Sequence, residues 1–427
     1  MADDSVLLRT EGHAGYITLN RPKALNALTH AMVDRIADAL DAWEADPAVR
    51  TVVIAGAGER GLCAGGDIRA IHDDARALRD GSHATDGDAR ATGGDARAAG
   101  DGARAARDEV QAVRDSARAT RDSARATRDD ARAAREGTRA TRADDRPGIG
   151  SASAAFWRAE YRLNARIARY PKPYVALMDG IVMGGGIGIS AHGGVRIVTE
   201  RSRLAMPETG IGFVPDVGGT YLLALAPGGL GTHLALTATA VGAADALLCG
   251  LADHHVPAAR LPEFAAALAR GTVHDVLPGF VAPPPEGELA AHREWIGACY
   301  AAPTVEEILD RLRACGHPAA KEAAEAILAK SPTALKVTLA ALRRAPALGP
   351  LERVLEQEYR VSCAALATPD LVEGIRAQVV DKDRNPRWTP ATLADVSAED
   401  VERFFAPLGD RELTLAPGDG PLQEVPW

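Results

Sequence analysis

The chain is poor in aromatic residues and cysteine and carries no long apolar run. Aromatic side chains make up 4% of its 427 residues. No stretch approaches the roughly 18 apolar residues that a membrane-spanning helix needs. Its five cysteines are odd in number and widely spaced, which favours a reduced protein over a disulfide framework or a Cys-rich metal site. The net charge of −9, with no basic stripe, argues against a nucleic-acid binder.

The N-terminal residues carry a prediction about location. The chain begins Met-Ala-Asp-Asp-Ser, which is acidic and leads directly into a strand-like run. Such a start has the features of neither a secretory signal nor a transit peptide. Together with the widely spaced cysteines, it predicts a cytoplasmic protein.

Strand-like and helix-like patterns alternate through the first part of the chain. The strand-like runs cover residues 6–10, 16–19, 51–55, 174–178 and 195–199. Between them, amphipathic stretches at 31–43 and 156–167 show the apolar spacing of helices. The alternation predicts an α/β fold in which repeated β-β-α turns build a parallel sheet.

Residues 73–150 interrupt this alternation. They are rich in Ala, Arg and Asp, and an arginine recurs every seventh position from Arg107 to Arg142. The period is that of a coiled coil, but the segment has almost no bulky apolar side chains to form a seam. We therefore predict an insert that is largely disordered or an exposed helix, in preference to a binding arm.

Residues 261–427 read as a helical region with Pro-rich breaks. Expected helices cover residues 305–315, 318–330, 333–345, 351–367 and 369–379. Several have cap-like residues at their starts, namely Thr304, Ser331 and Thr368.

Two glycine-rich turns are the first chemical signal. They are Cys-Ala-Gly-Gly-Asp-Ile-Arg at 63–69 and Met-Gly-Gly-Gly-Ile-Gly at 183–188, each following an apolar strand-like run. Glycine lets backbone N–H groups converge on a ligand oxygen without a Cβ in the way. Two such turns can supply two donors to one carbonyl, which is the arrangement of an oxyanion hole.

An acidic stretch at 206–219 is the second signal. It contains Glu208 and Asp216 at a spacing that can bring both carboxylates to one reacting centre. With the glycine turns, this predicts an acyl-group enzyme. Asp216 also fits a helix cap before Val-Gly-Gly, and the two roles are compatible. Residues 186–191 fit the G-x-G-x-x-A dinucleotide pattern, but a dehydrogenase would leave the first turn and the acidic pair unexplained.

Together these motifs resemble the crotonase (enoyl-CoA hydratase/isomerase) superfamily, and within it the 3-hydroxyisobutyryl-CoA hydrolase branch. The resemblance begins at residues 15–28, continues through both turns and 207–219, and returns at 331–336 and 380–388. It implies a crotonase-like spiral of β-β-α turns formed by residues 1–72 and 151–260. Residues 261–427 would then form a helical region that covers the acyl end of the site.

The resemblance implies hydrolysis of 3-hydroxyisobutyryl-CoA, or a similar short 3-hydroxyacyl-CoA thioester, in valine catabolism. Gly66 and Gly185 would be the oxyanion donors. Glu208 would act as nucleophile or as general base, and the sequence leaves both roles open. Asp216 would orient water, substrate or Glu208.

The resemblance also implies residues that contact substrate. Glu160 matches the position that contacts the substrate hydroxyl. Gly188 occupies the position at which hydratases carry a second Glu, so we expect it to line the acyl pocket and interpret its lack of a side chain as evidence against a hydratase or isomerase. The residues implied for coenzyme A are Lys23, Ala24, Leu25, Ala64, Gly65, Asp67 and Arg69, although Arg69 equally fits an exposed helix start.

No separate cofactor or metal is expected, because coenzyme A is part of the substrate. The expected partner is the acyl-CoA substrate, without nucleic acid or membrane, and self-association stays open. A non-catalytic CoA-binding scaffold is a third alternative. The presence of both Glu208 and Asp216 argues against it.

Overall fold

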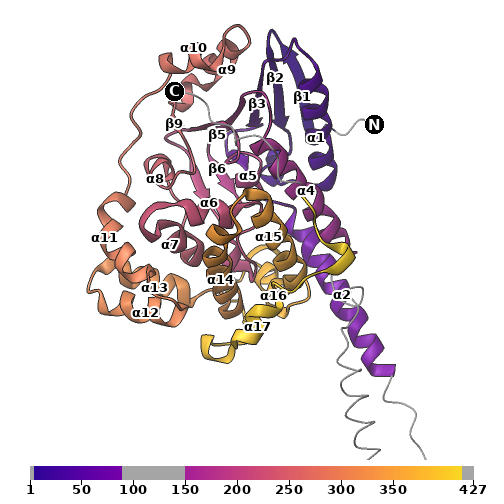
Figure 1. The fold of residues 1–427 in the computed structure, drawn as a ribbon, viewed down its shortest axis with the longest axis vertical. Helices are drawn as coiled ribbons and strands as arrows, with labels where there is room; N and C mark the ends of the chain where they lie inside the picture. Colours follow the sequence, from indigo (N-terminus) through magenta and orange to yellow (C-terminus); the bar gives the residue numbers. More distant parts are fainter. Residues whose placement is uncertain (1–3, 89–149, 416–427) are drawn as a thin grey trace, which may run out of the picture. The chain divides into compact units, whose positions relative to one another are not determined.

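The computed structural model describes residues 4–88 and 150–415. By its internal contacts the chain divides into a large unit, Met1–Leu78, Pro147–Leu408 and Glu412–Trp427, and a small unit, Arg79–Arg146 and Gly409–Arg411. Figure 1 labels the elements of the fold. Within the described ranges, no helix is both long enough and apolar enough to cross a membrane.

A six-stranded sheet is the main layer of the large unit. Its strand order is β1-β2-β3-β5-β7-β9, in which β1 and β2 are antiparallel and all later neighbours are parallel. The bounds are β1 (Val6–Glu11), β2 (Ala14–Leu19), β3 (Thr51–Gly56), β5 (Tyr174–Met178), β7 (Val195–Val198) and β9 (His254–His255). The strand-like runs of the sequence are thus confirmed close to their predicted bounds.

A second, smaller sheet contains three parallel strands that the sequence analysis did not identify. It has the order β4-β6-β8, with bounds β4 (Gly61–Cys63), β6 (Ile181–Met183) and β8 (Arg203–Ala205). Each strand has only three residues, too few for an alternating pattern to be visible. Because the strands are parallel, their carboxyl ends lie at one edge of the sheet. The two glycine turns and the acidic stretch all begin at that edge.

Both faces of the main sheet are covered. Val52 and Ile54 of β3 pack into the larger core, which includes Trp157, whereas Val53 between them packs with Phe264 on the opposite face. This is the period of two that a strand imposes on its side chains. The larger core contains helices α1 (His30–Ala45) and α4 (Ala152–Ala168), and the opposite face is covered by α9 (Leu261–Leu268).

The predicted start of the insert at residue 73 is wrong. Helix α2 (Ile68–Asp88) continues through that position, and Ala75 is fully buried in the core. The Asp74 carboxylate also accepts a hydrogen bond of 2.8 Å from the Ser153 backbone N–H in the first turn of α4. The predicted disorder of the remaining insert lies outside the described residues.

The C-terminal helical region is confirmed, with bounds close to those predicted. Its helices after α9 are α10 (Val273–Val276), α11 (Leu289–Tyr300), α12 (Val305–Ala314), α13 (Pro318–Leu328), α14 (Pro332–Leu348), α15 (Leu351–Ala365), α16 (Pro369–Ile375) and α17 (Ala398–Arg403). The side chains of Thr304 and Ser331 cap α12 and α14, but that of Thr368 does not cap α16. After α16 the chain forms a π-helical turn, Arg376–Val380, in place of a continuous α-helix.

Only part of this C-terminal region can cover the site. Helices α14 and α15 pack against α6 (Gly219–Leu225) and α4, and α16 packs against the acidic segment (Figure 1). In contrast, α9 packs on the far face of the main sheet. The expectation that residues 261–427 as a whole cover the acyl end is therefore too broad.

Candidate active site

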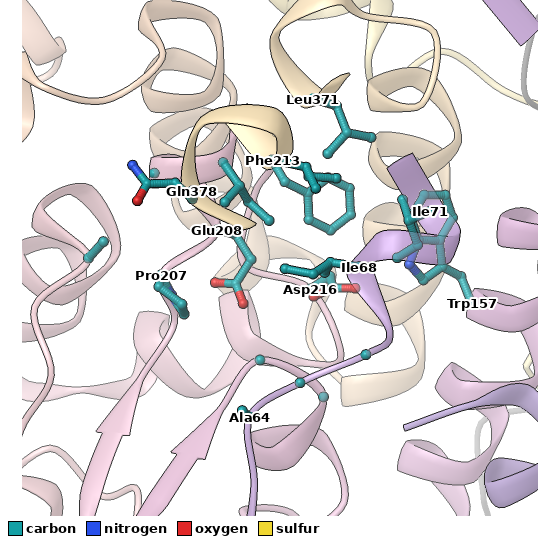
Figure 2. A pocket seen from close by; sticks show the side chains of 18 of the residues that line it. Ala64, Ile68, Ile71, Trp157, Pro207, Glu208, Phe213, Asp216, Leu371 and Gln378 are labelled. Atoms are coloured by element: carbon teal, nitrogen blue, oxygen red, sulfur yellow. The ribbon is translucent and has the colours of Figure 1, made fainter. Parts of the chain in front are cut away.

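A cavity of about 340 Å³ lies at the carboxyl edge of the small sheet. It is lined by residues that directly follow each of its three strands, together with helical residues from α2, α4 and the C-terminal region. Figure 2 shows the carboxylates of Glu208 and Asp216 in this cavity. The polar and glycine residues of the lining are Gly65, Gly66, Glu160, Gly184, Gly185, Glu208, Gly210, Asp216, Lys330 and Gln378.

The two glycine turns meet in the cavity. A Cβ placed on Gly185 would lie 3.3 Å from the Gly66 backbone nitrogen and 2.5 Å from Glu160 Oε1, so a side chain at Gly185 would collide with that carboxylate. Neither Gly66 nor Gly185 donates its N–H to another group in the described part of the chain. The preceding residues, Gly65 and Gly184, have φ values of +111° and +50°, which other residues rarely adopt.

Backbone hydrogen bonds to Leu28, which belongs to an earlier segment of the chain, hold the first turn around Gly66. The Leu28 N–H donates to Gly65 O and the Asp67 N–H donates to Leu28 O, each at 2.9 Å. These two bonds bracket Gly66, which lines the cavity, and neither of them uses the Gly66 N–H. The arrangement can present two N–H donors, from Gly66 and Gly185, to one ligand oxygen.

Glu208 follows β8 and Pro207, and it opens the short helix η3 (Glu208–Ile211). Its side chain is buried and lines the cavity, and Oε2 has no hydrogen-bond partner among the described residues. Burial, followed by the nearby Asp216 charge, raises the pKa of Glu208 well above its usual range. A buried carboxylate with an unmade hydrogen bond is unusual, and such groups concentrate at functional sites.

Asp216 does not cap a helix, so that alternative is wrong. Its carboxylate instead accepts a 2.7 Å hydrogen bond from the hydroxyl of Tyr161. The N–H groups that begin α6 are satisfied by Glu358 from the C-terminal region. Burial raises the pKa of Asp216 to about 7, although the Tyr161 hydrogen bond acts in the opposite direction.

Glu160 lies in the cavity, as the resemblance implied. It comes from α4 and is 2% exposed, and its Oε1 has no hydrogen-bond partner within the described residues. Burial, and then the Asp216 charge, raises the pKa of Glu160 well above its usual range. A carboxyl group kept protonated in this way can donate a hydrogen bond as well as accept one.

Gly188 does not lie where the sequence analysis expected it. It is absent from the cavity lining, and a Cβ at this position would lie 2.6 Å from Val217 Cβ and 2.9 Å from Asn164 Nδ2. Gly188 therefore permits close packing between α5 (Gly185–Gly188) and the Val217 turn. A Gly188→Glu substitution would disturb this packing, and it would not simply add an acid to the acyl pocket.

The residues predicted for coenzyme A fall into two groups. Ala64 and Gly65 line the cavity, and the Ala64 N–H donates to Leu25 O at 3.0 Å, which places the segment Lys23, Ala24 and Leu25 beside the first turn. The other two are held by the protein itself: Asp67 accepts from Arg21 at 3.2 Å, and Arg69 donates to Val379 O at 3.3 Å. Their contacts with coenzyme A stay predictions.

Sequence reasoning missed the apolar wall of the cavity and Lys330. The rings of Trp157 and Phe213 stack with centroids 5.5 Å apart, and Figure 2 shows Leu371 with them on the wall. The remaining apolar side chains of the lining include Ile68, Ile71, Phe156, Ile211 and Ile375. Ile68, Ile211 and Phe213 lie within the motifs at 63–69 and 206–219, but the other apolar residues come from distant parts of the chain. No pattern in the sequence indicated that they form one wall.

Within the described ranges, no group of three or more His, Cys, Asp or Glu residues is arranged to hold a metal ion. All five cysteines are free thiols, and four of them are buried.

Comparisons with known proteins show the family to which the chain belongs. A family model described as enoyl-CoA hydratase/isomerase matches residues 14–88 and 109–405. The chain is 38% identical over 421 residues to the mitochondrial 3-hydroxyisobutyryl-CoA hydrolase of Gallus gallus, covering 96% of this chain and 91% of the relative. It is 35% identical over 423 residues to the protein of the same name from Homo sapiens, covering 96% and 91%.

Two solved structures are similar over nearly the whole chain. One is a carnitinyl-CoA dehydratase from Mycobacterium thermoresistibile, with 47% identity and a TM-score of 0.77, covering 96% of this chain and 99% of that one. The other is an enoyl-CoA hydratase from Rhodobacter sphaeroides, with 38% identity and a TM-score of 0.75, covering 96% and 100%.

Proposed function

The chain belongs to the enoyl-CoA hydratase/isomerase family, and we propose that it hydrolyses 3-hydroxyisobutyryl-CoA, or a closely similar short 3-hydroxyacyl-CoA thioester, to the free acid and coenzyme A. The observation that carries the proposal is the pair of buried carboxylates, Glu208 and Asp216, in one cavity with two backbone N–H groups that have no partner among the described residues. Relatives named for this reaction align over 96% of the chain. The acid and thiol it releases fit a step in valine catabolism.

In the proposed reaction, the N–H groups of Gly66 and Gly185 bind the thioester oxygen. As the carbonyl carbon becomes tetrahedral, negative charge grows on that oxygen and both hydrogen bonds strengthen. Because these N–H groups are already in position before the reaction, no free energy is needed to orient them in the transition state. Removing one donor in comparable sites raises the barrier by about 2.7–4 kcal/mol.

Glu208 supplies the electron pair, and two routes are consistent with its position. In the first, a Glu208 oxygen bonds to the carbonyl carbon, the C–S bond breaks, and water later hydrolyses the resulting anhydride. In the second, Glu208 takes a proton from a water molecule as that water attacks, and the proton passes to the leaving thiolate. Either route consumes one water and releases one acid and one thiol. Asp216 orients the water, the substrate or Glu208.

The acyl group would lie between Glu160 and the apolar wall. A 3-hydroxyl group can satisfy Glu160 Oε1, which lacks a partner within the described residues. The stacked rings of Trp157 and Phe213 would contact the methyl branch. Coenzyme A would extend past Ala64 and Gly65 toward the segment 23–25, and no further cofactor takes part.

We place the reaction in the cytoplasm, which stays a proposal because the names of the vertebrate relatives refer to mitochondria. The five free cysteines suit a reducing compartment. Self-association also stays open.

Hydration or dehydration is the second candidate, and the names of the two similar structures favour it. The position that the resemblance assigns to a second hydratase carboxylate is Gly188, which does not line the cavity and therefore does not decide between the candidates. The pair of carboxylates in the cavity, Glu208 and Asp216, favours hydrolysis over hydration.

A substrate panel separates the two candidates. Free thiol release from 3-hydroxyisobutyryl-CoA, 3-hydroxypropionyl-CoA, isobutyryl-CoA and carnitinyl-CoA would be measured beside hydration of crotonyl-CoA. We expect thiol release that is fastest with the 3-hydroxyacyl esters. Double-bond hydration without thiol release would replace the proposal with the second candidate, and no turnover of any ester would favour a binding scaffold. Single-turnover hydrolysis in H₂¹⁸O then distinguishes the routes, because only the anhydride route can place ¹⁸O in the Glu208 peptide.

A further inference from the structure

We propose that Tyr161 is a positioning residue for the hydrolysis, which with Glu358 holds the Asp216 carboxylate in its working orientation. The inference rests on the proposed role of Asp216 in thioester hydrolysis. Four side chains are involved, and we call them the Asp216 clamp: Tyr161, His192, Glu358 and Ser362. Two of the four come from α15 in the C-terminal region.

The backbone after Asp216 needs external support. Val217 has a φ of +54°, in the left-handed region, where a β-branched residue is a genuine outlier. Such strain persists only where surrounding contacts over-determine it, and it concentrates at functional sites. The strained residue here directly follows a carboxylate that lines the cavity, so the turn sets the direction of Asp216.

Two clamp residues hold this turn: His192, which precedes it in the chain, and Glu358, which follows it. His192 Nε2 lies 2.8 Å from Val217 O. Burial lowers the pKa of His192 to about 4, so the ring is neutral and donates through Nε2–H. Glu358 accepts from the Gly218 N–H at 2.6 Å and from the Thr220 N–H at 2.9 Å. The turn is therefore fixed on both sides of the Gly218 peptide.

Tyr161 holds the carboxylate itself. Its hydroxyl donates to Asp216 Oδ2 at 2.7 Å and lies 2.8 Å from Ser362 Oγ. A phenol has one hydrogen, so when Tyr161 donates to Asp216, Ser362 must donate to Tyr161. The result is a directed chain from Ser362 through Tyr161 to Asp216, which favours the ionised carboxylate.

This hydrogen bond opposes strong local forces. The ionisable groups facing Asp216 are Glu160 and Tyr161 from α4, Glu208 from η3 and Glu358 from α15, and three of these are carboxyl groups. Burial and these neighbours favour the protonated acids, and only hydrogen bonds favour ionised Asp216. Tyr161 is the side-chain donor to Asp216. We therefore expect that loss of its hydroxyl changes the orientation of the Asp216 carboxylate and raises its pKa.

The test compares pH profiles of kcat and KM for two clamp variants. In Tyr161→Phe, the donor is lost while the ring is kept. We expect kcat to fall by about tenfold to a hundredfold, the range for a hydrogen bond to a charged group, with KM changed by less than about threefold. The acid limb should move to higher pH, because the lost hydrogen bond held the Asp216 pKa down.

Glu358→Gln should leave that limb where it is. Burial raises the pKa of Glu358 to about 8, so below that pH the side chain is largely protonated and the amide changes little of the charge that faces Asp216. The amide does replace one of the two oxygens that accept from the turn with a donor, so kcat should fall by about tenfold. A general loss of folding would not move the limb in one variant and leave it unmoved in the other, and melting temperatures recorded beside the kinetics would identify it.

Tyr359→Phe is the matched control. It removes the hydroxyl of the neighbouring ring, whose centroid lies 6.3 Å from that of Tyr161 in an edge-on arrangement. That hydroxyl accepts a hydrogen bond from Arg158. We expect kcat within about twofold of the wild type and an unmoved pH profile.

The outcomes separate this inference from the proposed function. If the wild type hydrolyses the thioester but Tyr161→Phe keeps both its rate and its pH profile, the positioning role is wrong. The same holds if Tyr161→Phe lowers the residual rate of Asp216→Asn by as much as it lowers the wild-type rate. If the wild type releases no thiol from any ester, the proposed function itself fails.

Discussion

The two sides of the cavity are built in different ways. The first glycine turn is held by hydrogen bonds between backbone groups, such as the two with Leu28 that bracket Gly66. The acidic side depends on distant side chains: Asp216 is held by Tyr161, and the turn after it is held by Glu358, 138 and 140 residues away along the chain from Thr220 and Gly218. Backbone donors need only a tight turn, whereas a carboxylate aimed by its side chain needs a surrounding frame.

This difference has a consequence for the ionisable groups. A backbone N–H cannot lose its function by titration, but a buried carboxylate can be protonated or displaced. Burial raises the pKa of Glu208 well above its usual range, and it raises the pKa of Asp216 to about 7. The function of the glycine turns should therefore not change with pH, but it should be lost when a side chain is added. The function of the acidic residues should change with pH.

The largest effect should follow from Glu208→Gln. The amide keeps the size of the side chain but loses its nucleophilicity and basicity, so we expect kcat to fall by at least about a thousandfold. Acyl-CoA binding, measured by calorimetry, should stay within about threefold. Near wild-type turnover would remove Glu208 from the mechanism.

The same variant should become more stable relative to the wild type as pH rises. The folded-state pKa of Glu208 is raised, so the folded protein binds an extra proton between the usual pKa and the folded one. The wild type therefore loses stability as pH rises through that interval, because Glu208 must give up its proton. The glutamine side chain of the variant does not titrate, so the variant does not lose stability in this way. A melting temperature of Glu208→Gln that falls below that of the wild type at pH 8 would contradict this account.

Gly185→Ala tests the glycine side. The new Cβ would lie 2.5 Å from Glu160 Oε1, so either the turn or that carboxylate must move, and we expect kcat to fall by about a hundredfold. Gly66→Ala meets only the Phe156 ring, at 3.2 Å, and should be milder. Gly279→Ala is the control, because nothing lies within 4 Å of its Cβ. Equal effects of all three substitutions would show that the close meeting of the two turns has no catalytic role.

The pH dependence of the wild type tests the acidic side. Ionised Glu208 and Asp216 are needed, and burial raises both pKa values, that of Asp216 to about 7, so kcat/KM should fall by at least about tenfold per unit as pH drops below about 7. In Gly66→Ala the limb should keep its position although the rate is lower. A limb near pH 4 would mean that neither raised carboxylate limits the reaction.

The smallest effect on activity should come from removing residues 79–146, which make up most of the small unit. Joining Leu78 to Pro147 through a short flexible linker should leave hydrolysis within about twofold, because the cavity lining lies entirely in the large unit. A deletion that starts at Asp74 should unfold at a lower temperature. It removes buried Ala75 and the hydrogen bond that Asp74 accepts from the first turn of α4, and a lost cap of this kind costs about 1 kcal/mol. Equal melting temperatures for the two deletions would show that α2 contributes nothing there.

The sequence was sufficient to predict five of the six strands of the main sheet, because runs such as those of β3 and β5 are long enough to read. The sequence analysis missed β9, which has only two residues. The sequence was not sufficient for the small sheet, whose strands have three residues each. The start of the insert was placed too early, because residues after 73 have the same composition as the insert, although Ala75 is buried. Small side chains carry little pattern even where they pack in a core.

What the sequence determined by itself is the chemistry available to the protein: glycine turns that free two N–H groups, and the carboxylates Glu208 and Asp216. What only the tertiary structure decided is how that chemistry is aimed. It excluded Gly188 from the cavity, gave the capping of α6 to Glu358 and placed Tyr161 on Asp216. The physical reason is that a backbone donor is directed by its own turn, whereas a buried carboxylate takes its orientation and its pKa from whatever surrounds it.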